Sequence, residues 1–314
     1  MLFRIIKRNC QLPNLSGGIA LFSSRTDLAR EWIKDPETPL PGVRCSKTRL
    51  FGLPVEETEI FSFEGEQALG KPRGIYTSLD VSALFDPEQN AFEPCVRGLC
   101  HTVCRHLPRE INGPNLFVGL GNRRLTADSL GPTVADGVIP TRHLLKNPAF
   151  RGCELREVAV IAPGVLGDTG LESAETVLFL AEKLSPSVCV LVDALAALDR
   201  GGLCKSIQVS NTGIAPGSGV GNHRFEINEK TVGVPCISVG VPTVVDAATL
   251  ASSVARDHGV DETGFSFSGE EMGFFVTPKD IDSLSQTCAR VLSAGLNLAF
   301  QPGLTLEDVE FLRS

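Results

Sequence analysis

Short hydrophobic runs alternate along this chain with longer segments in which hydrophobic residues recur every three or four positions. Runs this short predict strands buried on both faces, as the strands of a parallel sheet are. They lie at residues 75–84, 116–119, 158–161, 188–192, 206–210 and 235–239. The longer segments predict amphipathic helices at residues 92–107, 171–184, 243–255 and 277–298. This order of strand, loop and helix predicts an α/β fold with a mainly parallel sheet flanked by helices (α/β/α).

The amino-terminal part of the chain departs from this alternation. Residues 1–24 combine basic residues with glycines and a proline and show no sustained period, so we expect a leader or propeptide there. A single α/β domain then spans residues 25–314, and it begins with a helix that Thr26 or Asp27 caps. Residues 35–72 are rich in Pro, Gly, Glu and Thr, which predicts edge strands and loops.

Composition and charge narrow the function classes. The 314 residues are 42% hydrophobic and 21% charged, as in ordinary globular proteins, and no hydrophobic run approaches the length of a membrane span. A net charge of −8 argues against a broad basic face for nucleic acid. Ten cysteines are spread over a long chain without a convincing secretory signal. We therefore expect reduced thiols and a cytoplasmic protein, with neither a membrane nor a nucleic acid as partner.

Two segments resemble metal or nucleotide sites but fit neither well. Residues 95–106 hold three cysteines and two histidines, yet their spacing matches no zinc motif and the segment is an amphipathic helix. Residues 217–221 carry glycine at every second position, which departs from a dinucleotide fingerprint, and no P-loop lysine follows. The sequence therefore predicts no metal ion and no cofactor.

Two aspartates are candidates for catalysis because each follows a predicted buried strand. Asp193 comes directly after the run at 188–192, and Asp128 lies in the turn that follows the Gly119/Gly121 loop. Ligand and catalytic groups in α/β sheets lie beyond the carboxyl ends of the strands, so these residues are candidates for a carboxylate pair. Single aspartates at strand ends also cap helices or shape loops, and that interpretation stays open.

Other polar residues are candidates for lining the same site. Asn122 follows the first glycine loop, Glu172 stands at the start of a predicted helix, and Gly219 lies in the second glycine loop. His143, flanked by Arg142, could be a base or a ligand, although a lone histidine more often makes structural hydrogen bonds. No serine lies in a nucleophile elbow and no cysteine has an evident histidine partner, so the sequence does not support triad chemistry.

Ordered motifs run along nearly the whole chain after the leader. They are Gly119-Leu120-Gly121-Asn122, Leu130-Gly131-Pro132, Thr141-Arg142-His143-Leu144, Asp193-Ala194-Leu195-Ala196-Ala197 and Gly240-Val241-Pro242-Thr243, with others at residues 25–29, 163–165, 212–222 and 275–279. Together they resemble the germination protease family of endospore-forming bacteria. The resemblance implies an atypical aspartic endopeptidase, made as a tetrameric zymogen, with a fold similar to that of hydrogenase-maturation proteases. Its implied substrates are small acid-soluble spore proteins, which it would begin to degrade in the forespore or spore core during germination.

The resemblance also places the two functional aspartates of the family at Asp128 and Asp193. The departures from the family pattern are local and lie at Arg123, Arg124, Ala127 and Leu198. They leave two alternatives open. One is a metallopeptidase of the hydrogenase-maturation kind, in which carboxylates and His143 or His223 hold a divalent ion. The other is a spore-protein binding module whose catalysis the departures before Asp128 have weakened.

Overall fold

The computed structural model describes residues 26–33, 40–150, 154–216, 225–259 and 274–313. The described part is built on a nine-stranded sheet in the order β1-β2-β3-β7-β8-β6-β4-β5, and β9 pairs with β8. The strands are β1 (Val43–Leu50), β2 (Leu53–Ile60), β3 (Gly74–Asp80), β4 (Asn115–Gly119), β5 (Val158–Ile161), β6 (Val188–Ala197), β7 (Ser206–Ser210), β8 (Cys236–Asp246) and β9 (Phe275–Val276). The predicted leader lies outside the described residues, so its boundary with the domain stays a prediction.

The sheet has a parallel part and an antiparallel part. Strands β8, β6, β4 and β5 run parallel, in the part of the chain where strands and helices alternate. Strands β1, β2, β3 and β7 pair antiparallel and extend the sheet beyond β8. The turn Phe51-Gly52 joins β1 to β2 directly, and a connection this short can only reverse the chain. The predicted α/β fold is confirmed, and the sheet is mixed because its amino-terminal strands lack helical crossovers.

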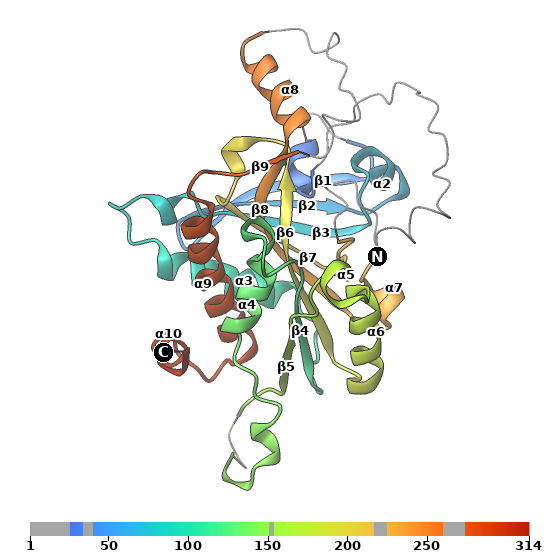
Figure 1. Ribbon diagram of the computed structural model, residues 1–314, viewed down its shortest axis with the longest axis vertical. Coiled ribbons are helices and arrows are strands. Elements are labelled where there is room, and N and C mark those ends of the chain that lie inside the picture. Colours follow the sequence, from blue (N-terminus) through green and yellow to red (C-terminus); the bar gives the residue numbers. More distant parts are fainter. Residues whose placement is uncertain (1–25, 34–39, 151–153, 217–224, 260–273, 314) are drawn as a thin grey trace, which may run out of the picture.

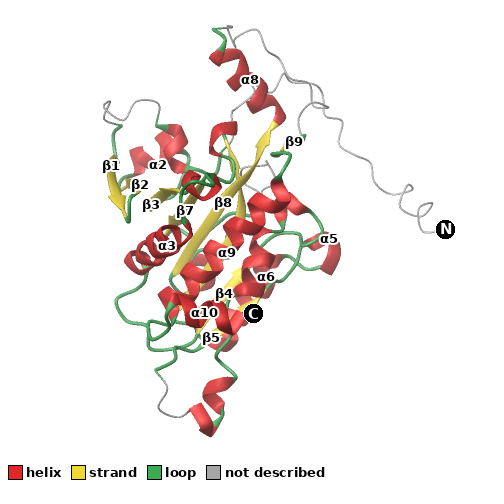
Figure 2. Ribbon diagram, turned by 90° about the vertical axis from the view of Figure 1, so that its left-hand side faces the viewer, coloured by secondary structure: helices red, strands yellow, loops and turns green. Residues whose placement is uncertain are grey.

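Helices cover both faces of the parallel strands. In Figure 1, α3, α4 and α9 lie together on one side of β4 and β6, and α5 and α6 lie on the other. Figure 2 shows the antiparallel strands β1, β2 and β3 at one end of the sheet, beside α2 and α3. The α-helices are α2 (Phe63–Leu69), α3 (Phe92–His106), α4 (Leu130–Gly137), α5 (Leu166–Thr169), α6 (Ser173–Leu184), α7 (Glu229–Val232), α8 (Ala247–Asp257), α9 (Ile281–Phe300) and α10 (Leu306–Arg313). Among the described residues, no helix is both long and apolar enough to cross a membrane.

The core sits on both sides of β6 because alternate residues of a strand face opposite layers. Val190 and Val192 join the larger hydrophobic cluster, beneath α3, α4 and α9. Leu191 joins the smaller cluster, beneath α6. In the larger cluster the rings of Phe117 and Phe300 meet edge to face, with centroids 4.7 Å apart. Two buried layers around a central strand hold that strand, and therefore Asp193 on it, in a fixed position.

The boundary between β8 and α8 differs from the sequence prediction. The sequence predicts a helix from residue 243, but β8 continues to Asp246 and α8 begins at Ala247. The β-branched residues at 243–245 favour the strand, and Asp246 ends it by accepting hydrogen bonds from the N–H groups of Ala248 and Thr249. Asp246 is therefore the helix cap, and Thr243 is a fully buried residue of the strand.

The predicted helix cap at the start of the domain is wrong as well. A 3₁₀ turn, η1 (Ala29–Trp32), follows Leu28, and no side chain caps it. Thr26 and Asp27 instead contact β6, where the Asp27 N–H donates to the Ala196 carbonyl at 2.9 Å. The segment is therefore tied to the sheet rather than to a helix of its own.

Candidate active site

The carboxyl end of β4 lies beside β6, at the edge of the β4–β6 pairing, and β6 continues from there to Ala197. Pairing of these parallel strands ends at Gly119 and Val192, and the Leu120 N–H donates to the Val192 carbonyl at 2.8 Å. Asp193 is the next residue of β6 and is buried, with 6% of its surface exposed. Its Oδ1 accepts a hydrogen bond from the N–H of Ala194 at 2.9 Å. The first candidate carboxylate is thus fixed where the β4–β6 pairing stops.

The loop after β4 brings the second candidate, Asp128, back to the same edge. Gly121 has φ of +114°, and a Cβ there would lie 2.1 Å from the main-chain oxygen of Asp128. Only glycine allows so close an approach at this backbone conformation. The Asn122 N–H then donates to Asp128 Oδ2 at 2.8 Å, which orients the carboxylate.

Residues around Asp128 also anchor its segment to the sheet. A Cβ on Gly131 would lie 2.1 Å from the Leu120 oxygen and 2.5 Å from the Val192 oxygen, so α4 starts directly against both strands. From β8, the hydroxyl of Thr243 donates to the Ala127 carbonyl at 2.6 Å. Gly131 and Thr243 therefore allow the close packing that positions Asp128.

Asp128 and Asp193 line one cavity of about 480 Å³. Most of its wall is apolar, from Leu120, Leu125, Val165, Leu195, Pro216, Val244 and Phe275. Two carboxylates held close together in an apolar cavity would favour a state that shares one proton, because two neighbouring negative charges repel each other. A pair in that state can act as base and acid towards one water molecule and one peptide bond. The prediction that these two residues come together agrees with this geometry.

Among the other predicted site residues, only Asn122 lies beside the pair. Glu172 caps α6, where its side chain and that of Glu175 form a reciprocal capping box. Its neighbour Ser173, rather than Glu172 itself, lines the cavity. Gly219 lies outside the described residues. The sequence found the start of α6 correctly but not which of its residues reaches the cavity.

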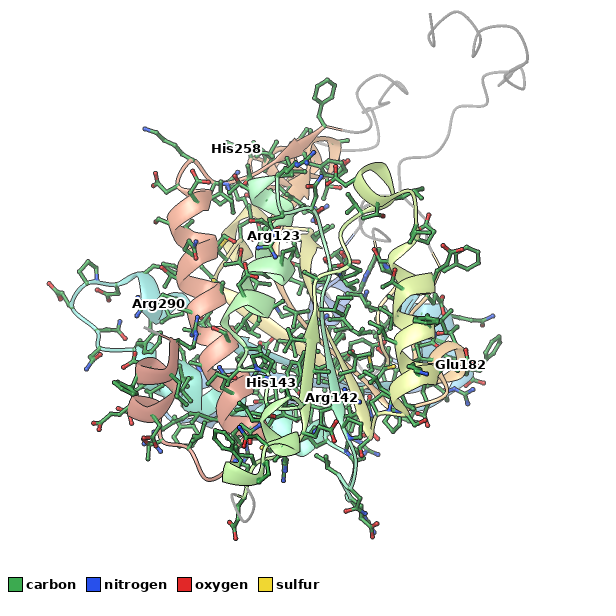
Figure 3. The ribbon with its side chains drawn as sticks, turned by 60° about the horizontal axis from the view of Figure 1, so that its bottom comes forward. Arg123, Arg142, His143, Glu182, His258 and Arg290 are labelled. Carbon is green, nitrogen blue, oxygen red and sulfur yellow. The ribbon has the colours of Figure 1, made fainter. Side chains whose placement is uncertain are left out.

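The prediction that Arg142 and His143 line the site is wrong. The Arg142 N–H donates to the carbonyl of Val158, the first residue of β5, and its side chain pairs with Glu157 at 2.8 Å. These contacts place both residues at the amino ends of the parallel strands, because α4 carries the chain back along the sheet before them. Figure 3 shows Arg142 and His143 close together and well apart from Arg123.

Of the residues that depart from the family pattern, Ala127 lines the cavity, whereas Arg123 and Arg124 form ion pairs with neighbouring helices. Arg123 pairs with Asp136 of α4, and Arg124 pairs with Asp168 of α5 at 3.3 Å. Among the described residues, no group of three His, Cys, Asp or Glu side chains is arranged to hold a metal ion. His223, the other candidate ligand, lies outside the described residues.

Two residues of the site were not predicted from the sequence. Asp27 lines the cavity beside Asp128 and Asp193, and Thr243 reaches the Asp128 segment from β8. Both lie in motifs that the sequence displays, residues 25–29 and 240–243, but each was read as a helix cap. The sequence did contain a signal for both residues. Each is a polar residue in a motif whose hydrophobic residues do not recur with the period of a helix, which argues against a helix cap.

Comparison with known proteins now places the chain in a family. The family model described as germination protease matches residues 26–264. The chain belongs to the germination protease family. The germination protease of Clostridium perfringens is 38% identical over 326 residues, which cover 92% of this chain and 98% of that protein. That of Clostridium tetani is 37% identical over 322 residues, covering 91% and 98%, and that of Priestia megaterium is 35% identical over 248 residues, covering 74% and 66%.

Family membership makes the chain a peptidase, and a protein substrate follows from that. The structure search also finds a hydrogenase maturation protease from Thermococcus kodakarensis, with a TM-score of 0.33 and 17% identity. That match covers 59% of this chain and 92% of the other.

Proposed function

We propose that this chain is an endopeptidase that starts the degradation of small acid-soluble spore proteins during spore germination, with Asp128 and Asp193 as its aspartate pair. The observation that carries the proposal is that both carboxylates line one cavity at the point where β4 ends beside β6. Family membership supports the protein substrate and the setting in germination.

The pair would hydrolyse a peptide bond with a single shared proton. The ionised carboxylate takes a proton from water as the water oxygen bonds to the scissile carbonyl carbon, and the protonated one donates to the carbonyl oxygen. As the C–N bond breaks, the leaving nitrogen takes a proton from the pair. The two protons come off with apparent pKa values that belong to the pair rather than to either residue. This sequence of steps needs no metal ion, and the apolar cavity wall strengthens each charge interaction.

Three finer proposals follow from membership in the family. Residues 1–24 form a propeptide, so the chain is made as a zymogen, and the single peptidase domain spans 25–314. The chain assembles as a homotetramer. It acts in the forespore or spore core, where its substrates are stored.

Replacement of either aspartate tests the central proposal. Asp128→Asn and Asp193→Asn keep the side-chain volume and one acceptor oxygen, but an amide can neither ionise nor share the proton. Each should lower kcat/KM for a small acid-soluble spore protein by about a thousandfold or more. The matched control is Asp136→Asn, an exposed aspartate on α4 that pairs with Arg123. Cleavage is followed by mass spectrometry of the fragments.

The same assay separates the alternatives. Activity that disappears on exhaustive chelation and returns with one divalent metal would establish the metallopeptidase instead. Tight substrate binding without turnover, by the intact and the trimmed chain alike, would establish the binding module. Wild-type rates in either asparagine variant would remove that residue from catalysis.

A further inference from the structure

A third carboxylate, that of Asp27, lines the same cavity as Asp128 and Asp193. It comes from the first described segment of the chain and meets a partner, Ala196, that lies 169 residues away in sequence. Nothing in the mechanism above uses it. A negative charge beside an aspartate pair raises the pKa values of that pair, so Asp27 would influence the protonation on which the reaction depends.

The Asp27 segment takes the place beside β6 that β4 leaves. Beyond Val192, β4 no longer pairs with β6. Farther along the same strand edge, the Asp27 N–H donates to the Ala196 carbonyl and the Ala196 N–H donates to Asp27 Oδ2, both at 2.9 Å. Between these points the Ala194 N–H donates to Asp193 Oδ1. Two successive N–H groups on one strand edge are therefore capped by the carboxylates of Asp193 and Asp27.

The segment itself is held firmly, which makes Asp27 a rigid support. Leu28 and Ala29 are completely buried. The side-chain amide of Gln208, on β7, accepts from the Ala29 N–H at 2.9 Å and donates to the Asp27 carbonyl at 3.0 Å. Asp27, whose carboxylate accepts a hydrogen bond from the Ala196 N–H, is thus attached to two strands of the sheet, β6 and β7.

A lysine, Lys71, shares a second cavity with Asp27. This cavity, of about 270 Å³, is more polar than the first and is also lined by Tyr76. Burial lowers the pKa of Lys71, and the carboxylates of Asp27 and Glu31 oppose that shift. Asp27 therefore shares one cavity with Lys71 and another with the two catalytic candidates.

We propose that Asp27 and Lys71 are positioning residues of the peptidase site. Asp27 fixes the strand end that carries Asp193, and the Lys71 ammonium offsets the negative charge of Asp27, so that the working proton stays on Asp128 and Asp193. The inference rests on the proposed function, because it assigns roles towards the same pair.

The charges around the pair determine in which direction each substitution shifts the apparent pKa values of Asp128 and Asp193. The charged and titratable groups that line the two cavities with Asp27, or act on Lys71, are Asp128, Asp193, Lys71, Tyr76, Glu226 and Glu31. Loss of the Asp27 charge removes a nearby anion, which lowers the apparent pKa values of the pair. Loss of the Lys71 charge leaves Asp27 uncompensated, which raises them.

Four variants of the trimmed chain test both roles. Asp27→Asn keeps an oxygen that can accept from Ala196, so kcat/KM should fall modestly while both limbs of its pH profile move to lower pH by roughly 0.5–1 unit. Lys71→Met should move both limbs to higher pH by a similar amount. The double variant should return the limbs close to their wild-type positions. Asp27→Ala also removes the grip on β6 and should lower kcat by about tenfold or more with KM little changed.

The control is Glu226→Gln, which removes a carboxylate from the same polar cavity, where it accepts from Asn228 rather than contacting β6. Its pH profile should match the wild type. A purely structural role would change the rate and the thermal midpoint without moving the limbs. Unchanged limbs in both Asp27→Asn and Lys71→Met, in variants that fold, would overturn the proposal.

A measurement that needs no turnover keeps the inference separate from the proposed function. The carboxyl carbons of ¹³C-labelled aspartates report the titration of Asp128 and Asp193 by NMR in the wild type, Asp27→Asn and Lys71→Met. Opposite shifts in the two variants support the coupling even if no spore protein is cleaved. Cleavage by the wild type without any such shifts would leave the proposed function standing and remove this inference alone.

Discussion

Gly121 controls how closely the glycine loop approaches Asp128. Its φ of +114° and the 2.1 Å that would separate a Cβ from the Asp128 oxygen both oppose any larger residue. We predict that Gly121→Ala displaces the Asp128 segment and lowers kcat/KM by about tenfold to a hundredfold. The free energy of unfolding should fall by about 1–3 kcal/mol because of the backbone strain.

Gly167 supplies the matched control for that substitution. It lies in α5, close to the site, but a Cβ there would meet nothing within 4 Å. Gly167→Ala should therefore leave kcat/KM and the urea midpoint near their wild-type values. Equal effects of the two substitutions would show that the rate loss at Gly121 does not arise from contact with Asp128.

His106, which lies outside the candidate site, makes the free energy of unfolding depend on pH. Burial, helped by the neighbouring Arg105, lowers the pKa of His106 to about 4, and its Nε2 lies 3.0 Å from the hydroxyl of Thr77. Between pH 6.5, its ordinary pKa, and about 4, the unfolded chain takes up a proton that the folded chain does not. Stability from the neutral histidine is therefore complete above the ordinary pKa and is lost as the pH falls through this window.

Replacement of His106 should flatten that pH dependence. Between about pH 7 and about pH 4.5, the wild type should lose about 2–3 kcal/mol more unfolding free energy than His106→Gln. Urea unfolding followed by circular dichroism measures the difference. His101→Gln, on the exposed part of the same helix, is the control and should follow the wild type. Parallel curves for the wild type and His106→Gln would show that folding does not lower the pKa of His106.

At the level of elements, the sequence predicted the buried strands well, because a short continuous hydrophobic run is compatible with few structures other than a buried strand. β4, β5 and β7 match their predicted ranges closely, whereas β6 continues to Ala197, beyond the predicted 188–192. The boundary of β8 and α8 was missed because helix-compatible residues follow β-branched ones, and tertiary packing of Thr243 favours the strand. Of the antiparallel strands, β1 and β2 were predicted only as unspecified edge strands within 35–72, since their pairing depends on contacts between distant segments.

The residues of the candidate site were likewise predicted only in part. Asp128 and Asp193 could be predicted because each follows a strand of the parallel sheet, and the strand ends of such a sheet converge. Arg142 and His143 were wrongly placed because a motif does not state at which end of the sheet it lies. Asp27 was missed as a site residue because its role depends on a contact with Ala196, 169 residues away, which no local pattern encodes.

For the molecule as a whole, the first described residues join the leader to the peptidase site. The hydroxyl of Thr26 lies 3.3 Å from the Ala196 carbonyl, and Asp27 lines the catalytic cavity. The predicted leader precedes this segment in the sequence. If residues 1–24 are the proposed propeptide, their removal should open the site, whereas removal of the segment at residues 26–29 should take away its contacts with β6.

The last prediction contrasts two amino-terminal deletions on this basis. A chain that begins at Ser24 should show higher kcat/KM than the full chain, with an unchanged thermal midpoint, because it keeps every contact of the Thr26 segment. A chain that begins at Ala29 loses the buried Leu28 and the Asp27 bonds to Ala196, and its unfolding free energy should fall by about 2–5 kcal/mol. Its activity should fall with it.

Peptidase assays and thermal melts under identical conditions compare the three chains, and mass spectrometry locates any self-cleavage of the full chain. We expect such cleavage between Gly17 and Arg25, before Thr26, which is the first described residue and contacts β6. Equal activity of the full chain and the chain that begins at Ser24, with no trimming at any pH tried, would show that residues 1–24 do not inhibit the enzyme. Full stability of the chain that begins at Ala29 would instead show that the Thr26 segment does not hold the end of β6, and the positioning role of Asp27 would then lose its structural basis.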